Sequence, residues 1–275
     1  MSPRMPSLAD AFARARQESR LALIGYLPAG FPEPSRFAAA VRAAAASGLD
    51  VLELGLPVPA PHLDGPIIRS ALKVQRSLGI DFHEALRLGA AVRRAAKLPV
   101  VAMGYAAQLE PGTDPARAAG EAARHIAAAG LDGVLFPDLS HEAFAALAAH
   151  AASSGIAAVG FIRPEDTTEG VESVLAACAR LDGTFVYVQS CAPQTGGPVD
   201  LAATARLVRH VVEARGNQAL PVAVGFGIQT PEHVAYLRKL GVEGVIVGTA
   251  LVEAAEGSSQ AVGQTVAALA RAARG

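Results

Sequence analysis

Two acidic residues lie close together in the sequence, one within an apolar segment and one shortly after it. Glu53 lies within the apolar run VLELGL at residues 51–56, and Asp64 comes shortly afterwards in LDGP, beyond a proline-rich stretch. A carboxylate inside an apolar core is costly unless it is paired, hydrogen-bonded or protonated, so such a pair is suited to acid–base chemistry. A buried ion pair would also explain Glu53, and an ordinary Asp-Gly-Pro turn would explain Asp64.

Short β-rich apolar runs recur along the chain, each followed by a turn and an Ala-, Leu- and Arg-rich helical segment. Continuous apolar strands indicate burial on both faces, hence a parallel sheet covered by helices. We therefore predict an α/β fold, a (β/α)₈ TIM barrel that forms a single domain over residues 1–275. An open doubly wound sheet is the competitor, but its GxGxxG fingerprint and a P-loop are both missing. The predicted strands are residues 21–26, 51–56, 99–105, 133–138, 158–163, 184–190, 221–227 and 244–249.

The N-terminal stretch is predicted to form a short amphipathic helix. Ser7 and Asp10 resemble a capping box, and Leu8 and Phe12 share one face. We expect this helix to cover one end of the barrel core.

In such barrels the chemistry takes place at the C-terminal ends of the strands, which is where Glu53 and Asp64 are predicted to lie. Glycines occur at the matching ends of later strands, in QTGG at 194–197, GFG at 225–227 and VGT at 247–249. Each is a routine turn when taken alone. Together they predict a phosphate site, because backbone N–H groups beside a helix N-terminus bind phosphate, and Thr249 can add a hydroxyl.

Composition and charge narrow the classes of ligand. Hydrophobic residues make up 51% of the chain, the formal net charge is −1, and no Lys/Arg block with interleaved aromatics occurs. These features favour a small-molecule ligand over nucleic acid or a membrane surface, and no run approaches the roughly 20 apolar residues of a membrane span. Two cysteines are too few for a disulfide framework, so a reducing, cytoplasmic location is expected. The histidines show no metal-binding spacing, so no metal is predicted, and we interpret His62 and Cys191 as incidental.

The order and spacing of several segments resemble the tryptophan synthase alpha chain family over nearly the whole chain. The segments are GYLPAGFP, VLELGLPVPAPHLDGPIIRSA, FPDLSHEAF, FVYVQS followed by TGG, VGFGI and VIVGTALVE. The resemblance implies a lyase that cleaves indole-3-glycerol phosphate by retro-aldol chemistry to indole and glyceraldehyde 3-phosphate, with no metal or organic cofactor. A β subunit is the partner that it implies.

The resemblance also assigns site residues. Glu53 and Asp64 match the catalytic acids, and Tyr187 matches a tyrosine near the glutamate. The phosphate-binding positions are Gly196, Gly227, Gly248 and Thr249, where the family usually has serine at the last. The substrate-binding positions are Tyr26, Ile68, Met103, Tyr105, Leu135, Phe161, Thr195 and Phe226. Barrel filling would equally explain most of the apolar members of this set.

The implied chemistry suits these acids. Protonation of indole C3 and deprotonation of the adjacent glycerol hydroxyl can both be carried out by one carboxyl group. An apolar cavity would raise the pKa of Glu53 from about 4.3 towards neutrality, which lets it give and take protons. Asp64 would stay ionised and accept a hydrogen bond from the indole N–H.

Four positions depart from the family pattern. Ala60, Ala107 and Ser140 replace residues usually found as Asp, Asn and Pro on the face that docks the β subunit, and Cys191 replaces a loop arginine. We therefore hypothesise that the chain acts without the usual β partner or serves a different β-like protein. Two alternatives stay open: an aldolase or isomerase for another phosphorylated substrate, and a non-catalytic phosphate-binding barrel.

Overall fold

The computed structural model describes residues 4–109, 112–191, 195 and 199–275. The strands are β1 (Ala22–Pro28), β2 (Val51–Gly55), β3 (Val100–Met103), β4 (Gly133–Leu135), β5 (Ala157–Ala158), β6 (Gly160–Ile162), β7 (Val186–Gln189), β8 (Val222–Gly225) and β9 (Gly244–Val247). The helices are α1 (Leu8–Gln17), α2 (Pro34–Ala46), α3 (Pro66–Ser77), α4 (Phe82–Ala96), the 3₁₀ helix η1 (Ala106–Gln108), α5 (Pro115–Ala128), α6 (His141–Ser153), α7 (Thr168–Cys178), α8 (Leu201–Arg215), α9 (Pro231–Arg238), α10 (Thr249–Gly257) and α11 (Ser259–Arg274).

The strands form one parallel sheet that closes into a barrel. Their order is β5-β4-β3-β2-β1-β9-β8-β7-β6, so the two ends of the sheet are consecutive in the chain. The Val159 N–H donates to Val134 O, and the Gly160 N–H donates to Phe185 O, so this one segment joins both ends. The predicted (β/α)₈ barrel is confirmed, with one difference: the run expected at 158–163 is divided at Val159 into β5 and β6.

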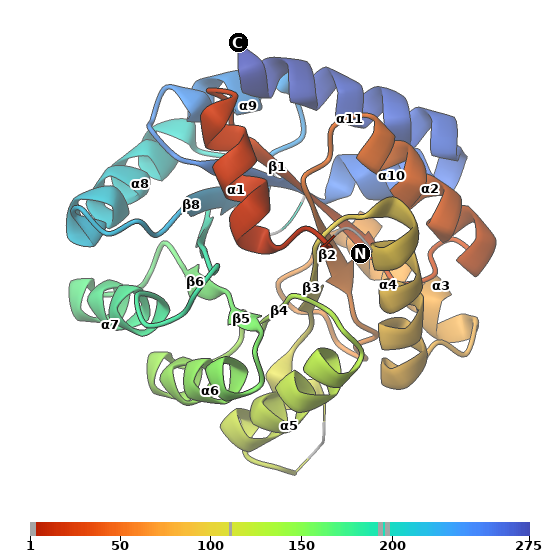
Figure 1. The fold of residues 1–275 in the computed structure, drawn as a ribbon, viewed down its shortest axis with the longest axis horizontal. Coiled ribbons are helices and arrows are strands. Elements are labelled where there is room, and N and C mark those ends of the chain that lie inside the picture. Colours follow the sequence, from red (N-terminus) through yellow and green to blue (C-terminus); the bar gives the residue numbers. More distant parts are fainter. Residues whose placement is uncertain (1–3, 110–111, 192–194, 196–198) are drawn as a thin grey trace.

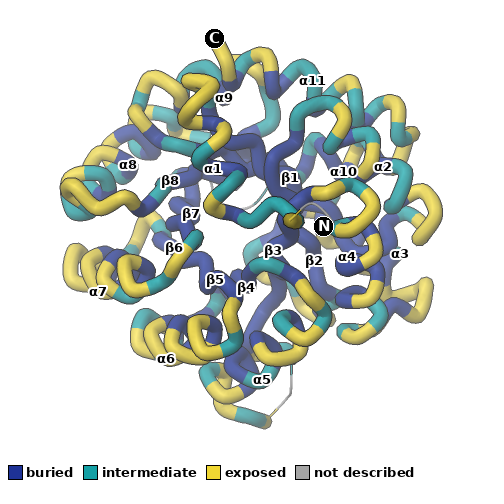
Figure 2. The backbone as a smooth tube through the Cα atoms, viewed as in Figure 1, coloured by how far each residue is buried: buried dark blue, intermediate teal, exposed yellow. Residues whose placement is uncertain are grey.

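The helices surround the strands, as the ribbon in Figure 1 shows. All seven residues of β1 and all five of β2 are buried, since the sheet is covered outside and filled inside. Figure 2 shows the same division, with buried strands and helices exposed on their outer sides. Burial on both faces explains why these strands are continuously apolar rather than alternating.

Helix α1 covers the N-terminal ends of the strands, as predicted, and crosses in front of them in Figure 1. Ser7 caps it, and the capping box with Asp10 is complete. A Cβ at Gly133 would lie 3.3 Å from Leu8, and one at Gly244 would lie 3.1 Å from Phe12. The helix therefore packs closely on the first residues of β4 and β9.

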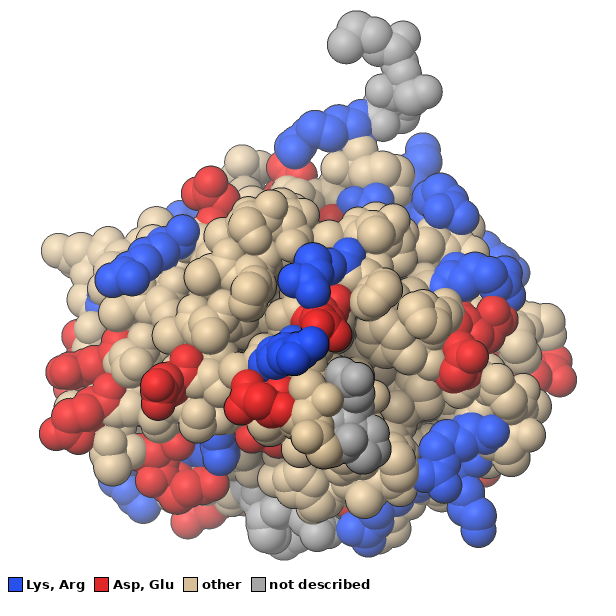
Figure 3. All heavy atoms as spheres, turned by 90° about the horizontal axis from the view of Figure 1, so that it is seen from below, with Lys and Arg blue, Asp and Glu red and all other residues tan. Residues whose placement is uncertain are grey.

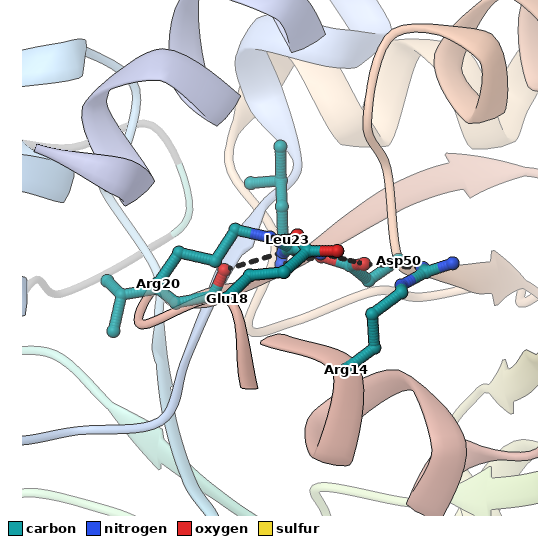
Figure 4. Close-up of polar contacts among 6 residues, drawn as sticks. Arg14, Glu18, Arg20, Leu23 and Asp50 are labelled. Atoms are coloured by element: carbon teal, nitrogen blue, oxygen red, sulfur yellow. Dashed lines mark hydrogen bonds and ion pairs between the residues drawn. The ribbon is translucent and has the colours of Figure 1, made fainter. Parts of the chain in front are cut away.

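A buried carboxylate fastens β1 to β2 at this same end (Figure 4). Asp50 is 1% exposed and accepts the Leu23 N–H at 2.9 Å. The Arg20 guanidinium makes two bonds to it, of 2.5 and 2.9 Å, and Arg14 adds a third at 2.7 Å. Glu18 binds Arg20 from the other side at 2.6 Å. Every polar group that this arrangement buries thus has a partner.

The same arrangement recurs twice around the barrel. Asp132 precedes β4 and Glu243 precedes β9, and each stands in the register position that Asp50 has before β2. Each accepts a backbone N–H from the neighbouring strand at 2.8 Å and forms an ion pair with an arginine. The backbone donors are Val100 and Val222, and the arginines are Arg93 and Arg215.

The surface carries charges of both signs. On the face drawn in Figure 3, acidic and basic side chains are interspersed among uncharged residues, and no continuous basic area is seen there. Within the described ranges, none of the helices combines the length and the apolar character that crossing a membrane would require.

Candidate active site

A cavity lies at the C-terminal ends of the strands. It holds about 460 Å³ of space free of protein atoms, including its opening to solvent, a volume within the usual range for small-ligand sites. Apolar side chains make up most of its wall, and two carboxyl groups face the same space. Its lining residues are Tyr26, Glu53, Asp64, Ile68, Met103, Leu135, Phe161, Tyr187, Thr195, Phe226, Gly227, Ile228, Ile246, Gly248 and Thr249.

The residues predicted from the sequence meet at this cavity with two exceptions. Gly196 lies outside the described residues. Tyr105 is 1% exposed and lies behind Asp64, to which its hydroxyl donates a hydrogen bond of 2.8 Å. The cavity thus brings together side chains from distant parts of the chain, which supports assigning them to one site.

Glu53 is buried without a counter-charge among the described residues. Its side chain is 4% exposed, and its Oε2 atom has no hydrogen-bond partner among the described residues. Burial, followed by the negative charge of Asp64, raises its pKa to about 8. In the described part of the chain no ion pair with Glu53 is formed, so the ion-pair explanation of its burial finds no support there. Glu53 is therefore mostly protonated at neutral pH.

Asp64 is equally buried, but polar and charged groups of the chain stabilise its ionised form. It is 2% exposed, and burial raises its pKa to about 6. The hydrogen bond from Tyr105 opposes this rise, as do the positive charges of His62 and Arg69. At neutral pH one carboxyl group in the cavity is thus protonated and its neighbour is ionised, an arrangement that can supply an acid and an anion together.

The loop that carries Asp64 is fastened on two sides. The Leu63 N–H donates to the Tyr105 hydroxyl at 3.3 Å, and the Gly65 N–H donates to Thr195 Oγ1 at 2.6 Å. A Cβ at Gly65 would overlap the carbonyl oxygen of Thr195, so only glycine permits this approach. The contact brings the loop after β7 against the loop after β2, beside the cavity.

Three aromatic rings form one wall. The Phe161 and Tyr187 rings lie 5.1 Å apart, and Tyr187 meets Phe226 edge to face at 5.9 Å. Burial, then the charges of Glu53 and Asp64, raises the pKa of Tyr187 well above its ordinary value, so the hydroxyl stays protonated. This wall is suited to a flat aromatic ligand.

The part of the cavity formed by residues 226–227 and 248–249 has the features of an anion site. Phe226 and Gly227 both have left-handed backbone, with φ of 68° and 66°, and the Ser190 hydroxyl donates to Phe226 O at 2.6 Å. Gly248 is the N-cap of α10, and Thr249 begins the helix. The free N–H groups and the positive dipole end of such a helix favour a phosphate.

Two residues that line the cavity were not predicted from the sequence. They are Ile228, which directly follows GFG, and Ile246, which lies two residues before Gly248. Their positions at strand ends were the signal that could have identified them. Within the described residues, no three His, Cys, Asp or Glu side chains gather to hold a metal ion.

Comparison with known proteins points to one family. The sequence profile of the tryptophan synthase alpha chain matches residues 12–274. The tryptophan synthase alpha chain of Halorhodospira halophila is 39% identical over 90% of this chain and 87% of its own, and that of Rippkaea orientalis is 32% identical over 93% and 92%. A structure of Mycobacterium tuberculosis tryptophan synthase superposes with a TM-score of 0.84 at 29% identity, covering 98% of this chain and 99% of that one.

Proposed function

The chain belongs to the tryptophan synthase alpha chain family, which makes it a lyase of tryptophan synthesis, and we propose that its cavity performs a retro-aldol cleavage of indole-3-glycerol phosphate. The products are indole and glyceraldehyde 3-phosphate. The observation that carries this proposal is a protonated Glu53 beside an ionised Asp64 in one largely apolar cavity. An aromatic wall suits the indole, and the α10 N-terminus suits the phosphate.

In the first step Glu53 acts as an acid. Its carboxyl proton passes to C3 of the indole, which leaves a positive charge shared with the ring nitrogen. The carboxylate of Asp64 accepts a hydrogen bond from the ring N–H and stabilises that charge inside a cavity of low dielectric. A neutral Asp64 would lose most of this stabilisation.

In the second step Glu53 acts as a base. As a carboxylate it takes the proton of the hydroxyl on the carbon attached to C3. The O–H electron pair forms the aldehyde C=O bond, and the electrons of the breaking C–C bond return to the ring and neutralise it. Glu53 ends protonated, as it began, so no external proton carrier is required.

The direct test is indole release by the purified chain from indole-3-glycerol phosphate. We expect equal amounts of indole and glyceraldehyde 3-phosphate. An isomerised substrate would instead favour the aldolase or isomerase alternative. The absence of any product would favour the non-catalytic barrel or an enzyme for another phosphorylated substrate. Phosphate-ligand binding without turnover would identify the non-catalytic barrel.

The activity should depend on pH in a bell shape centred near neutrality. The reaction requires an ionised Asp64 and a protonated Glu53. We therefore expect kcat/KM to fall below a pH of about 6 and above a pH of about 8. Because the two acids interact, these two limits belong to the pair rather than to either residue. Replacing Asp64 with Asn removes the negative charge that raises the pKa of Glu53, so the alkaline limb should move to lower pH. Rates measured from pH 5 to 10 test this, and an unmoved alkaline limb in Asp64→Asn would contradict the coupling.

We propose that the activity does not depend on a β subunit. Ala60, Ala107 and Ser140 are exposed, and they lie in the segments that follow the neighbouring strands β2, β3 and β4, Ala107 within η1. Their backbone or side-chain polar groups already have partners within the chain, in Gln108, Asp138 and the Ala143 N–H.

Adding a cognate β subunit should therefore change kcat by less than the factor of about 5 at which allosteric coupling usually begins. Lyase assays with and without β, together with a pull-down, measure this. Strong activation by β would refute the proposal.

We also propose a cytoplasmic location. Both cysteines are free, Cys178 buried and Cys191 half-buried, as expected for a reducing compartment. Burial raises the pKa of Cys178 to about 12, so this thiol is poorly reactive.

A further inference from the structure

We propose that Gln108 is a positioning residue for Asp64, because its side-chain amide fastens the loop 57–65 to the helix η1. This inference rests on the proposed reaction, in which Asp64 stabilises the charged ring. It identifies one contact within the chain that holds the first half of this loop.

The contact consists of two hydrogen bonds to a single residue. The Ala60 N–H donates to Gln108 Oε1 at 2.7 Å, and Gln108 Nε2 donates to Ala60 O at 2.5 Å. The amide thus pairs with both backbone groups of Ala60, as a neighbouring strand would. Two such bonds restrict the orientation of the loop as well as its distance, which one bond would not.

Gln108 itself stands on a fixed support. The helix η1 has only three residues and would not be stable alone. The Asp138 carboxylate accepts the Ala106 N–H at 2.8 Å and the Ala107 N–H at 2.9 Å, which ties η1 to the end of β4. An anion at these free N–H groups stabilises the short helix.

The same segment reaches Asp64 by a second route. Tyr105 precedes η1, and its hydroxyl contacts both Asp64 Oδ2 and the Leu63 N–H. The loop is therefore held at two places from one anchored segment, by Gln108 at Ala60 and by Tyr105 near the carboxylate. The Arg76 guanidinium also binds the loop, at the carbonyl oxygens of Val58 and Pro59. With Gln108 removed, Ala60 would lose both of its backbone hydrogen bonds, and the link from η1 to the first half of the loop would be lost.

The loss should affect catalysis more than folding. Ala60 is exposed and Gln108 is only half-buried, so their contact buries little apolar surface. Asp64 must stay close to the indole N–H, and small displacements of a catalytic group lower the rate strongly. The contact therefore contributes mainly to the geometry of the loop.

The test is Gln108→Leu, which has nearly the same size and cannot pair with Ala60. We expect kcat for indole release to fall about tenfold with KM and the unfolding midpoint nearly unchanged. Hydrogen exchange in the segment 57–65 should become about tenfold faster. Gln218→Leu, at an exposed glutamine before β8, is the matched control. It should change neither kcat nor hydrogen exchange in the segment 57–65.

A second background separates positioning from general destabilisation. In Asp64→Asn, the charge that Gln108 positions is already missing, so Gln108→Leu should lower kcat by less than about twofold there. The same tenfold loss in both backgrounds, or unchanged exchange in Gln108→Leu, would overturn the proposal. Absence of indole release from the unmodified chain would refute the proposed reaction and the catalytic role with it, while exchange would still report the two hydrogen bonds.

Discussion

Replacing Glu53 with glutamine should lower indole release about 1,000-fold, within the range expected when a general acid and base is lost. Glutamine has the shape of the protonated carboxyl group but cannot pass a proton to C3 or take one from the hydroxyl. The Glu53 side chain is buried, and its Oε2 has no hydrogen-bond partner among the described residues, so the exchange disturbs few contacts. Steady-state indole release measures the effect.

Two controls define the meaning of that loss. Binding of glycerol 3-phosphate should be nearly unchanged, because the residues proposed to bind the phosphate are Gly227, Gly248 and Thr249, which line the cavity with Glu53. Retention of more than about a tenth of the activity would show that another group carries the proton. Loss of phosphate-ligand binding along with turnover would point to a structural role for Glu53.

The same variant should be more stable than the natural chain at alkaline pH. The pKa of Glu53 is raised by folding from its ordinary value to about 8. Its contribution to stability is therefore intact below the unfolded-state pKa and is lost as pH rises through about 8, because the folded chain must then bury a charge. Glutamine does not ionise, so the stability of Glu53→Gln relative to the natural chain should increase as the pH rises to about 8. Thermal unfolding measured across this pH range tests this. Such a gain would show a catalytic group kept at a cost in stability.

Replacing Asp50 with alanine should lower the free energy of unfolding by about 3 kcal/mol, the lower part of the range for breaking a buried ion pair. The Arg20 side chain is 7% exposed, and the change leaves its guanidinium with the Glu18 carboxylate and the Leu21 carbonyl as partners. The Leu23 N–H, near the start of β1, also loses its acceptor. Denaturant unfolding monitored by circular dichroism measures the loss.

An exposed ion pair provides the contrast. Glu84 and Arg87 on α4 are joined at the surface, so Glu84→Ala should cost only about 0 to 1 kcal/mol. Indole release by the folded Asp50 variant should stay normal, since Asp50 precedes β2 and the cavity lies at the other end of the strands. A loss similar to that of the Glu84 variant would mean that the barrel closes without this carboxylate.

The sequence by itself determined the barrel and the composition of its site. Short, continuous apolar runs bounded by turns indicate strands that are buried on both faces, and their regular alternation with helical segments leaves few arrangements. Ser7 and Asp10 predicted α1 because a capping box is a contact between neighbours in the chain. Glu53 and Asp64 could be placed at one end because parallel strands bring their C-terminal ends together.

The proton-carrying role of Glu53 was expected before the fold was known, but only the tertiary structure supplied a physical cause for it. Burial raises the pKa of both acids, and the charge of Asp64 raises that of Glu53 further. The pKa of Asp64 rises less because Tyr105, 41 positions further along the chain, donates a hydrogen bond to it and the positive charges of His62 and Arg69 act on it. The pairing of Gln108 with Ala60 and the three carboxylates at the barrel's N-terminal end are likewise contacts across strands. Pattern and propensity describe neighbours along the chain, whereas burial, hydrogen bonding and charge act through space, so these properties could be assigned only once the barrel had closed.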